Sequence, residues 1–122
     1  MLRRLLLPLL LFALVLAFAA AGNAKGDGTL KGEVYGNALF KIEMKGVNGK
    51  DLKTIKAGTY TIKVEDKGTI HDFRLQGPGV NKATSITGTG DQTWTVKLKP
   101  GTYTYLCDPH RGLMRGTFKV TS

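Results

Sequence analysis

The sequence contains one cysteine and two histidines among 122 residues. A single cysteine cannot form a disulfide bond within the chain, so disulfides cannot hold this fold together. A free thiol is easily oxidised outside the cytoplasm unless it is buried or bound to something. The lone thiol is therefore the first indication of a metal site.

After Ala24 the sequence lacks any long hydrophobic run and any stretch with a convincing helical period,. Acidic residues are also few, 9 against 18 lysines and arginines, which gives a formal net charge of +9. The basic residues are scattered singly, with no basic helix and no zinc finger, so we expect no nucleic-acid partner. A basic protein outside the cytoplasm could instead meet acidic proteins, anionic lipid headgroups or cell-wall polymers.

The first 21 residues have the pattern of an export signal. Arg3 and Arg4 precede an apolar run over residues 5–21, which ends in small residues of the kind that a signal peptidase accepts,. We predict a cleaved signal peptide over 1–21, with an uncleaved membrane anchor as the alternative because the run is near the lower length limit for spanning a bilayer. The protein is then exported, to the periplasm or the extracellular space. We assign 22–36 to a flexible segment and a first strand, and 37–122 to one domain.

The remaining sequence is typical of an all-β protein. Short segments of alternating polarity, rich in β-branched and aromatic residues, are separated by turns that contain glycine and proline,. We predict strands over 41–45, 59–65, 70–75, 93–98, 102–107 and 117–120, and turns over 66–68, 76–79 and 100–101. Residues 80–90 are the least regular, and a short helical turn is an alternative there. Many short strands at near-regular spacing indicate a sandwich or a barrel.

One short loop brings together residues that bind soft metals. Cys107, His110 and Met114 lie within eight residues, and His71 begins an earlier predicted strand. Two imidazoles, a thiolate and a weak thioether favour copper, because the sulfur ligands stabilise Cu(I) and the imidazoles also suit Cu(II). Zinc would accept cysteine and histidine, but methionine is rare in zinc sites.

Each of these residues has an ordinary structural explanation when it is taken alone. Cys107 could be an inert buried thiol, His71 a hydrogen-bonded core residue and Met114 core filling. Taken together, the only cysteine and both histidines fall on positions that suit a single site. We therefore predict one copper ion bound by His71, Cys107, His110 and Met114.

Several segments carrying these residues resemble the plastocyanin/azurin-like cupredoxins. They are TIHDF (69–73), PGTYTYLCDPH (100–110) and MRGTF (114–118), and the resemblance extends from about Gly58 to the C-terminus. It implies a two-sheet Greek-key β-sandwich with a type 1, or blue, copper at one end. It also implies that His71, Cys107 and His110 are the equatorial ligands and that Met114 is the axial ligand.

The resemblance further implies a one-electron carrier, which we expect to be a monomer and not an enzyme. Electrons would pass through the exposed edge of His110, inside an apolar rim formed by Pro109, Leu113 and Pro78. We expect Arg111 and Arg115, which flank this rim, to steer a redox partner with an acidic docking face. The alternative function is a copper-binding module for storage, delivery or resistance. A multicopper enzyme would need more histidines, and a dinuclear copper site would need a second cysteine.

Two features depart from the usual pattern of the family. Only three residues separate His110 from Met114, one fewer than is usual in plastocyanins. Asp72 follows the first ligand where asparagine is common, and the residue opposite it is expected to be Asp108. Two neighbouring carboxylates would raise the pKa of one of them and could make the reduction potential depend on pH, unless Arg74, Arg111 or water neutralises them.

Overall fold

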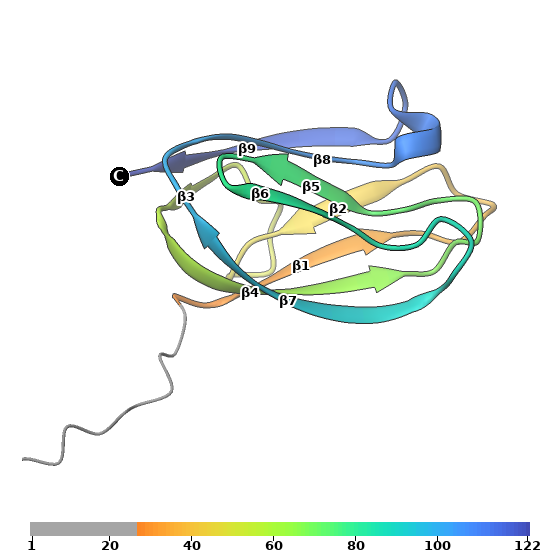
Figure 1. The fold of residues 1–122 in the computed structure, drawn as a ribbon, viewed down its shortest axis with the longest axis horizontal. Coiled ribbons are helices and arrows are strands. Elements are labelled where there is room, and N and C mark those ends of the chain that lie inside the picture. Colours follow the sequence, from red (N-terminus) through yellow and green to blue (C-terminus); the bar gives the residue numbers. More distant parts are fainter. Residues whose placement is uncertain (1–26) are drawn as a thin grey trace, which may run out of the picture.

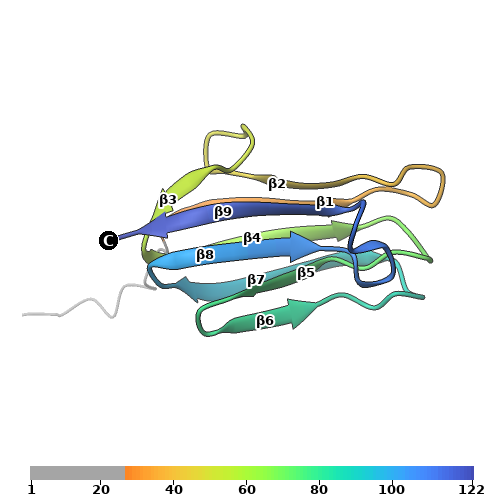
Figure 2. The same ribbon diagram turned by 90° about the horizontal axis from the view of Figure 1, so that it is seen from above.

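The computed structural model describes residues 27–122, which form a two-sheet β-sandwich (Figure 1). The first sheet has the strand order β2 (Ile42–Lys45), β1 (Thr29–Val34), β4 (Gly58–Asp66) and β7 (Gly90–Leu98). The second has the order β3 (Thr54–Lys56), β9 (Arg115–Thr121), β8 (Gly101–Leu106), β5 (Arg74–Gly77) and β6 (Val80–Ala83). Figure 2 looks onto this second sheet. The predicted signal peptide lies outside the described residues.

Both sheets are mixed, and their inner faces make the core. β1 pairs parallel with β4, and β3 pairs parallel with β9, while the other ladders are antiparallel. Alternate residues of β4 and β7 are buried, such as Ile62 and Val96, because successive side chains of a strand point to opposite faces,. The predicted all-β sandwich is confirmed. None of the helical structure within 27–122 is long and apolar enough to cross a membrane.

Both ends of the strand predicted over 70–75 are wrong. β5 begins at Arg74 and continues to Gly77, whereas residues 70–73 are not in a strand. His71, Asp72 and Phe73 are buried one after another, which strand alternation does not allow,. The backbone N–H of Phe73 donates to the hydroxyl of Thr84 at 2.9 Å and not to a neighbouring strand.

Two further predictions about the strands need correction. Residues 80–83 form strand β6, hairpinned to β5, and no helical turn lies within 80–90. Gly79 makes this tight turn possible because its φ of 72° lies in the left-handed region that glycine adopts without strain,. Strand β3 was not predicted, because its three residues are too few to show a clear alternating pattern.

The fold places the candidate ligands at one end of the sandwich. β8 ends at Leu106, and the chain turns through the short 3₁₀ helix η1 (Asp108–His110) before β9 begins at Arg115. Four backbone hydrogen bonds tighten this loop. Cys107 N–H donates to Met114 C=O at 3.0 Å, His110 N–H to Cys107 C=O at 3.0 Å, and the N–H groups of Leu113 and Met114 to His110 C=O at 3.0 and 2.8 Å. Pairing of β5 with β8 brings His71, just before β5, beside this loop.

Candidate metal centre

Three potential ligand atoms from two distant segments meet at this end. The Nδ1 atoms of His71 and His110 are 3.1 Å apart. The Sγ atom of Cys107 is 3.4 Å from Nδ1 of His110 and 3.7 Å from Nδ1 of His71. The lone cysteine and both histidines of the chain therefore form one cluster, as the sequence predicted.

The spacing of these atoms fits a single metal ion. An ion about 2.0–2.3 Å from each of three coplanar ligands holds those ligands about 3.5–4 Å apart. The observed separations of 3.1–3.7 Å are close to this range. Two imidazoles and a thiol that face one point form a donor set that suits copper.

Burial favours the neutral form of two of the three groups. Cys107 and His71 are fully buried, whereas His110 is only partly buried. Burial raises the pKa of the Cys107 thiol. Burial and the nearby imidazole of His110 lower the pKa of His71. A neutral histidine is the form that binds metal, so His71 is ready to act as a ligand.

Met114 closes the loop from its far side. Its side chain is 1% exposed, and its backbone is hydrogen-bonded to both Cys107 and His110. The fourth predicted ligand is therefore part of the same tight loop, with its side chain in the buried interior. The three residues between His110 and Met114 are enough for the turn to close.

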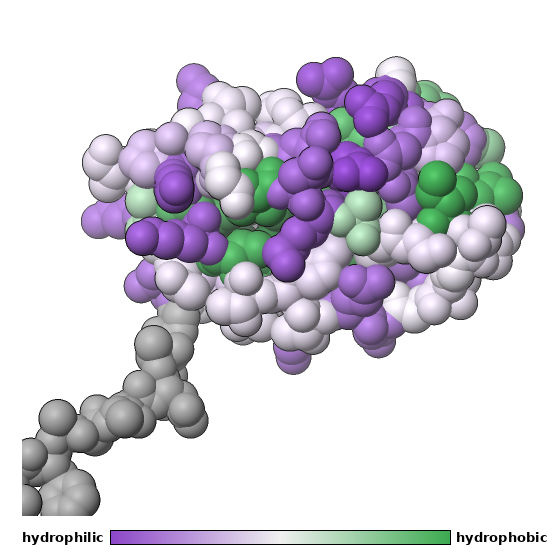
Figure 3. Space-filling view, in the orientation of Figure 1, coloured by the Kyte–Doolittle hydropathy of each residue, from purple (hydrophilic) through white to green (hydrophobic). Residues whose placement is uncertain are grey.

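Aromatic and aliphatic side chains surround the exposed edge of the cluster. The ring of Phe40 packs edge-on against His110, with centroids 4.9 Å apart, and against His71, at 5.3 Å. Leu39, Ile70 and Leu113 are also exposed. We call Leu39, Phe40, Ile70 and Leu113 the apolar surface. In Figure 3 hydrophobic side chains, green, gather at the right-hand end of the molecule, which carries η1 in Figure 1.

The predicted apolar rim is correct in part. Pro109 and Leu113 are exposed in the loop of His110. The predicted place of Pro78 in the rim is wrong. Pro78 follows β5 at the opposite end of the sandwich, where its carbonyl accepts a hydrogen bond from the hydroxyl of Tyr103. The prediction missed Leu39 and Phe40, although a pair of large apolar residues in a polar loop was a possible signal.

A network of charged groups joins the two ligand segments behind the metal site. Asp72 accepts the backbone N–H of Asp108 at 2.5 Å. The Asp108 carboxylate accepts from Arg74 Nε at 2.7 Å and from an Arg111 guanidinium N–H at 2.5 Å. The fold thus ties the residue after His71 to the residue after Cys107, as the resemblance implied.

The two carboxyl groups of this network have opposite pKa shifts. Burial and a hydrogen bond with Asp108 raise the pKa of Asp72 to about 6. The bond with Asp72, together with those from Arg74 and Arg111, lowers the pKa of Asp108 to about 2. The expected rise in one pKa is therefore present, and arginine neutralises Asp108. A pH-dependent reduction potential stays a prediction.

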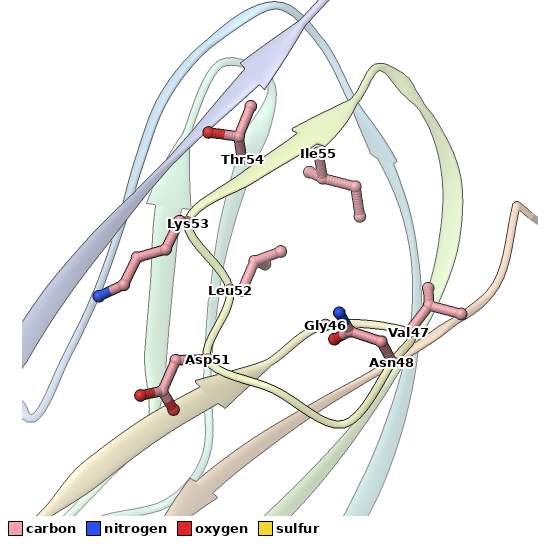
Figure 4. Close-up of a pocket in the computed structure, with 8 residues that line it drawn as sticks. All are labelled: Gly46, Val47, Asn48, Asp51, Leu52, Lys53, Thr54 and Ile55. Carbon is pink, nitrogen blue, oxygen red and sulfur yellow. The ribbon is translucent and has the colours of Figure 1, made fainter.

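A cavity of about 540 Å³ lies elsewhere, beside the β2–β3 loop (Figure 4). Its lining combines apolar side chains such as Val47 and Ile55 with Asn48, Asp51 and Lys53. No histidine, cysteine or methionine lines this cavity, so it does not contribute to the metal centre.

Comparison with known proteins agrees with the geometry. Residues 36–121 match the sequence profile of the family described as copper binding proteins, plastocyanin/azurin family. Auracyanin B shares 16% identity with a TM-score of 0.55, over 82% of this chain and 93% of that chain. Reduced rusticyanin shares 20% identity with a TM-score of 0.52, over 76% and 78%.

A chain in a heme-copper terminal oxidase dimer also matches, with 21% identity and a TM-score of 0.50, over 78% of this chain and 65% of that chain. At these identities the likeness to the solved structures shows the shared fold alone.

Proposed function

Because the chain belongs to the plastocyanin/azurin family of copper-binding proteins, we propose that it is an exported one-electron carrier whose single copper ion is bound by His71, Cys107, His110 and Met114. The convergence of three donor atoms within 3.7 Å, beside an exposed apolar surface, is the observation that carries this proposal. Bound copper would supply a reversible one-electron step between Cu(II) and Cu(I).

The chain's own residues hold the ligands in place for such a step. His71 and Cys107 are buried and anchored by strands β5 and β8. The loop that carries His110 is fixed by its own backbone hydrogen bonds. A ligand set held in this way would change its geometry little between oxidation states, so electron transfer would need little reorganisation.

His110 is the route by which electrons would enter and leave. It is the only one of the three clustered ligands that is partly exposed, and it lies beside Phe40 and Leu113. A redox partner that covers the apolar surface would come close to the imidazole edge. Arg115 is exposed and forms no ion pair within residues 27–122, which supports an acidic partner.

The visible spectrum of the copper-loaded protein tests this assignment. We expect strong absorbance from the thiolate–Cu(II) bond and reversible cycling, both lost in Cys107→Ser. Met114→Leu should alter the spectrum and the potential, whereas Met44→Leu, at an equally buried core position, should leave both unchanged. A colourless protein with readily exchanged Cu(I) would favour the storage or delivery function instead.

Electron-transfer rates at different salt concentrations test the acidic partner. Rates with an acidic redox protein should fall as salt rises, because salt screens the attraction. Arg115→Glu should reduce the low-salt rate more than Arg111→Glu, since Arg111 is already paired with Asp108. Lys63→Glu, which makes the same charge change on β4, is the control. Equal rates in all variants would exclude electrostatic docking at this end.

A further inference from the structure

Five lysines without an acidic partner gather at the end of the sandwich opposite the metal centre. All five are exposed, and none takes part in an ion pair within residues 27–122. We call them the basic end: Lys53, Lys56, Lys97, Lys99 and Lys119.

Strand register places these lysines at a similar level along the length of the molecule. β7 and β9 both finish at this end, and β3 runs parallel to β9 with Thr54 beside Lys119. Leu98 pairs with Gly58, the first residue of β4. Lys97 and Lys99, on either side of Leu98, therefore lie near the beginning of β4. Figure 1 shows the ends of β3, β7 and β9 at the left, away from η1 at the right.

Most acidic residues are paired with other basic residues or lie elsewhere, which leaves most of this charge uncompensated. Four of the nine form ion pairs with Lys31, Lys41, Lys45 and Lys67; they are Glu33, Glu43, Asp51 and Glu65.

Of the other five acidic residues, four lie away from the basic end. Asp66 and Asp72 are buried, and Asp108 pairs with arginines. Asp91 pairs in register with Glu65, near the metal end of β4. Asp27 lies at the basic end, where it accepts the N–H of Thr59 at 3.0 Å. Asp51, which is paired with Lys45, is also near enough to Lys53 for their charges to interact.

The polypeptide also enters the domain at the basic end. The N–H of Asp27 donates to the carbonyl of Thr59, at the beginning of β4. In the sequence, only residues 22–26 separate this point from the apolar run over 5–21. If residues 5–21 stay in the membrane as an anchor, the membrane would therefore meet the domain on its basic side. If they are cleaved, the membrane across which the chain is exported would meet the same side.

We propose that the basic end lies against an anionic lipid surface and so directs the metal centre away from the membrane. Each lysine close to an anionic bilayer strengthens binding about fivefold, and the effect fades within about one Debye length, roughly 8–10 Å. β4 alone has nine residues, about 30 Å of extended chain, between the basic end and the metal end,. The apolar surface around His110 would thus stay free for a redox partner.

Vesicle binding by residues 22–122 tests the proposal. This piece contains both sheets and the whole described core of the sandwich, which lie within residues 27–122. We expect binding to vesicles with about 30% phosphatidylglycerol, weak binding to pure phosphatidylcholine, and release as salt rises. Lys97→Glu/Lys119→Glu should weaken binding by about 25-fold or more, from about fivefold per lysine. The control Lys63→Glu/Lys82→Glu makes the same charge change on β4 and β6 and should weaken it less than about threefold.

Orientation is measured with an environment-sensitive dye on an added cysteine, while copper protects the buried Cys107. The emission of a dye at Thr121→Cys should shift on binding, and that of a dye at Leu113→Cys should not. Any one of three results would overturn the proposal. They are equal losses of vesicle binding in the two double variants, an emission shift of the dye at Leu113→Cys alone, and binding to a soluble polyanion without binding to vesicles. The assay involves no electron transfer, so its failure would leave the carrier function untouched.

Discussion

The hydroxyl of Tyr103 offers a sharp test of what closes the sandwich at the end away from the metal. Tyr103 is fully buried, and its ring stacks on Phe118 with centroids 5.4 Å apart. Its hydroxyl donates to the carbonyl of Pro78 at 2.6 Å and accepts the N–H of Lys99 at 3.0 Å. One oxygen thus links the β5–β6 turn to the β7–β8 turn. Tyr103→Phe would remove this link and nothing else.

The size of the effect follows from those two hydrogen bonds. Phenylalanine keeps the ring and its stacking, so no cavity opens in the core. Each lost hydrogen bond costs about 1 kcal/mol net, which gives about 2 kcal/mol in the free energy of unfolding. For a domain of this size, about 4–8 °C of Tm is lost per kcal/mol, so Tm should fall by about 8–16 °C.

Urea unfolding of the metal-free protein, followed by circular dichroism, measures this loss. The control is Tyr60→Phe, which removes a single hydrogen bond, to the carbonyl of Lys56 at 2.8 Å, and should cost about half as much,. A loss for Tyr103→Phe no greater than for Tyr60→Phe would refute the reasoning. The visible spectrum of copper-loaded Tyr103→Phe should match that of the wild type, and a changed spectrum would show that the two ends are coupled.

Three other substitutions test the packing and the charges. Gly32→Ala should destabilise the protein by about 1–3 kcal/mol in urea unfolding, because a Cβ would lie 2.5 Å from the buried ring of Phe73,. Burial raises the pKa of Asp66, so its contribution to stability is full below the unfolded pKa of about 3.9 and is lost as pH rises through the folded value,. Asp66→Asn should therefore gain stability relative to wild type as pH rises from 4 to 8, and a constant difference would contradict this. Arg74→Gln should cost about 1–2 kcal/mol at pH 7, since Asp108 loses a partly buried, charge-assisted hydrogen bond,; an unchanged urea midpoint would contradict that.

The metal cluster was predictable because its residue types are so scarce. With one cysteine and two histidines, the sequence offers few ways to build a soft-metal site, and Cys107 and His110 are already joined by a short loop. The position of His71 depends on long-range pairing of β5 with β8, which the sequence does not show directly. Alternating polarity was nevertheless sufficient to predict the long strands β4, β7 and β8.

The failures occurred where local polarity conflicts with tertiary contacts. Residues 70–73 contain apolar side chains that suggest a strand, but His71, Asp72 and Phe73 are all buried. The backbone N–H of Phe73 donates to the hydroxyl of Thr84 and not to a neighbouring strand. β6 was missed because Asn81 and Lys82 are poor strand formers at an exposed sheet edge,. Pro78 was placed beside the metal without knowledge of where β5 ends.

The surroundings of the site depend on a loop that lies outside the motifs carrying the metal ligands. Phe40 comes from the loop between β1 and β2, before the recognisable motifs begin, yet its ring contacts both clustered histidines. The ligands themselves lie within those motifs. The ligand loop must keep its donor atoms to bind a metal, whereas a neighbouring loop can change the polarity around His110 without disturbing those atoms. Differences in partner choice among proteins with this ligand set should therefore arise first from loops such as the one that carries Phe40.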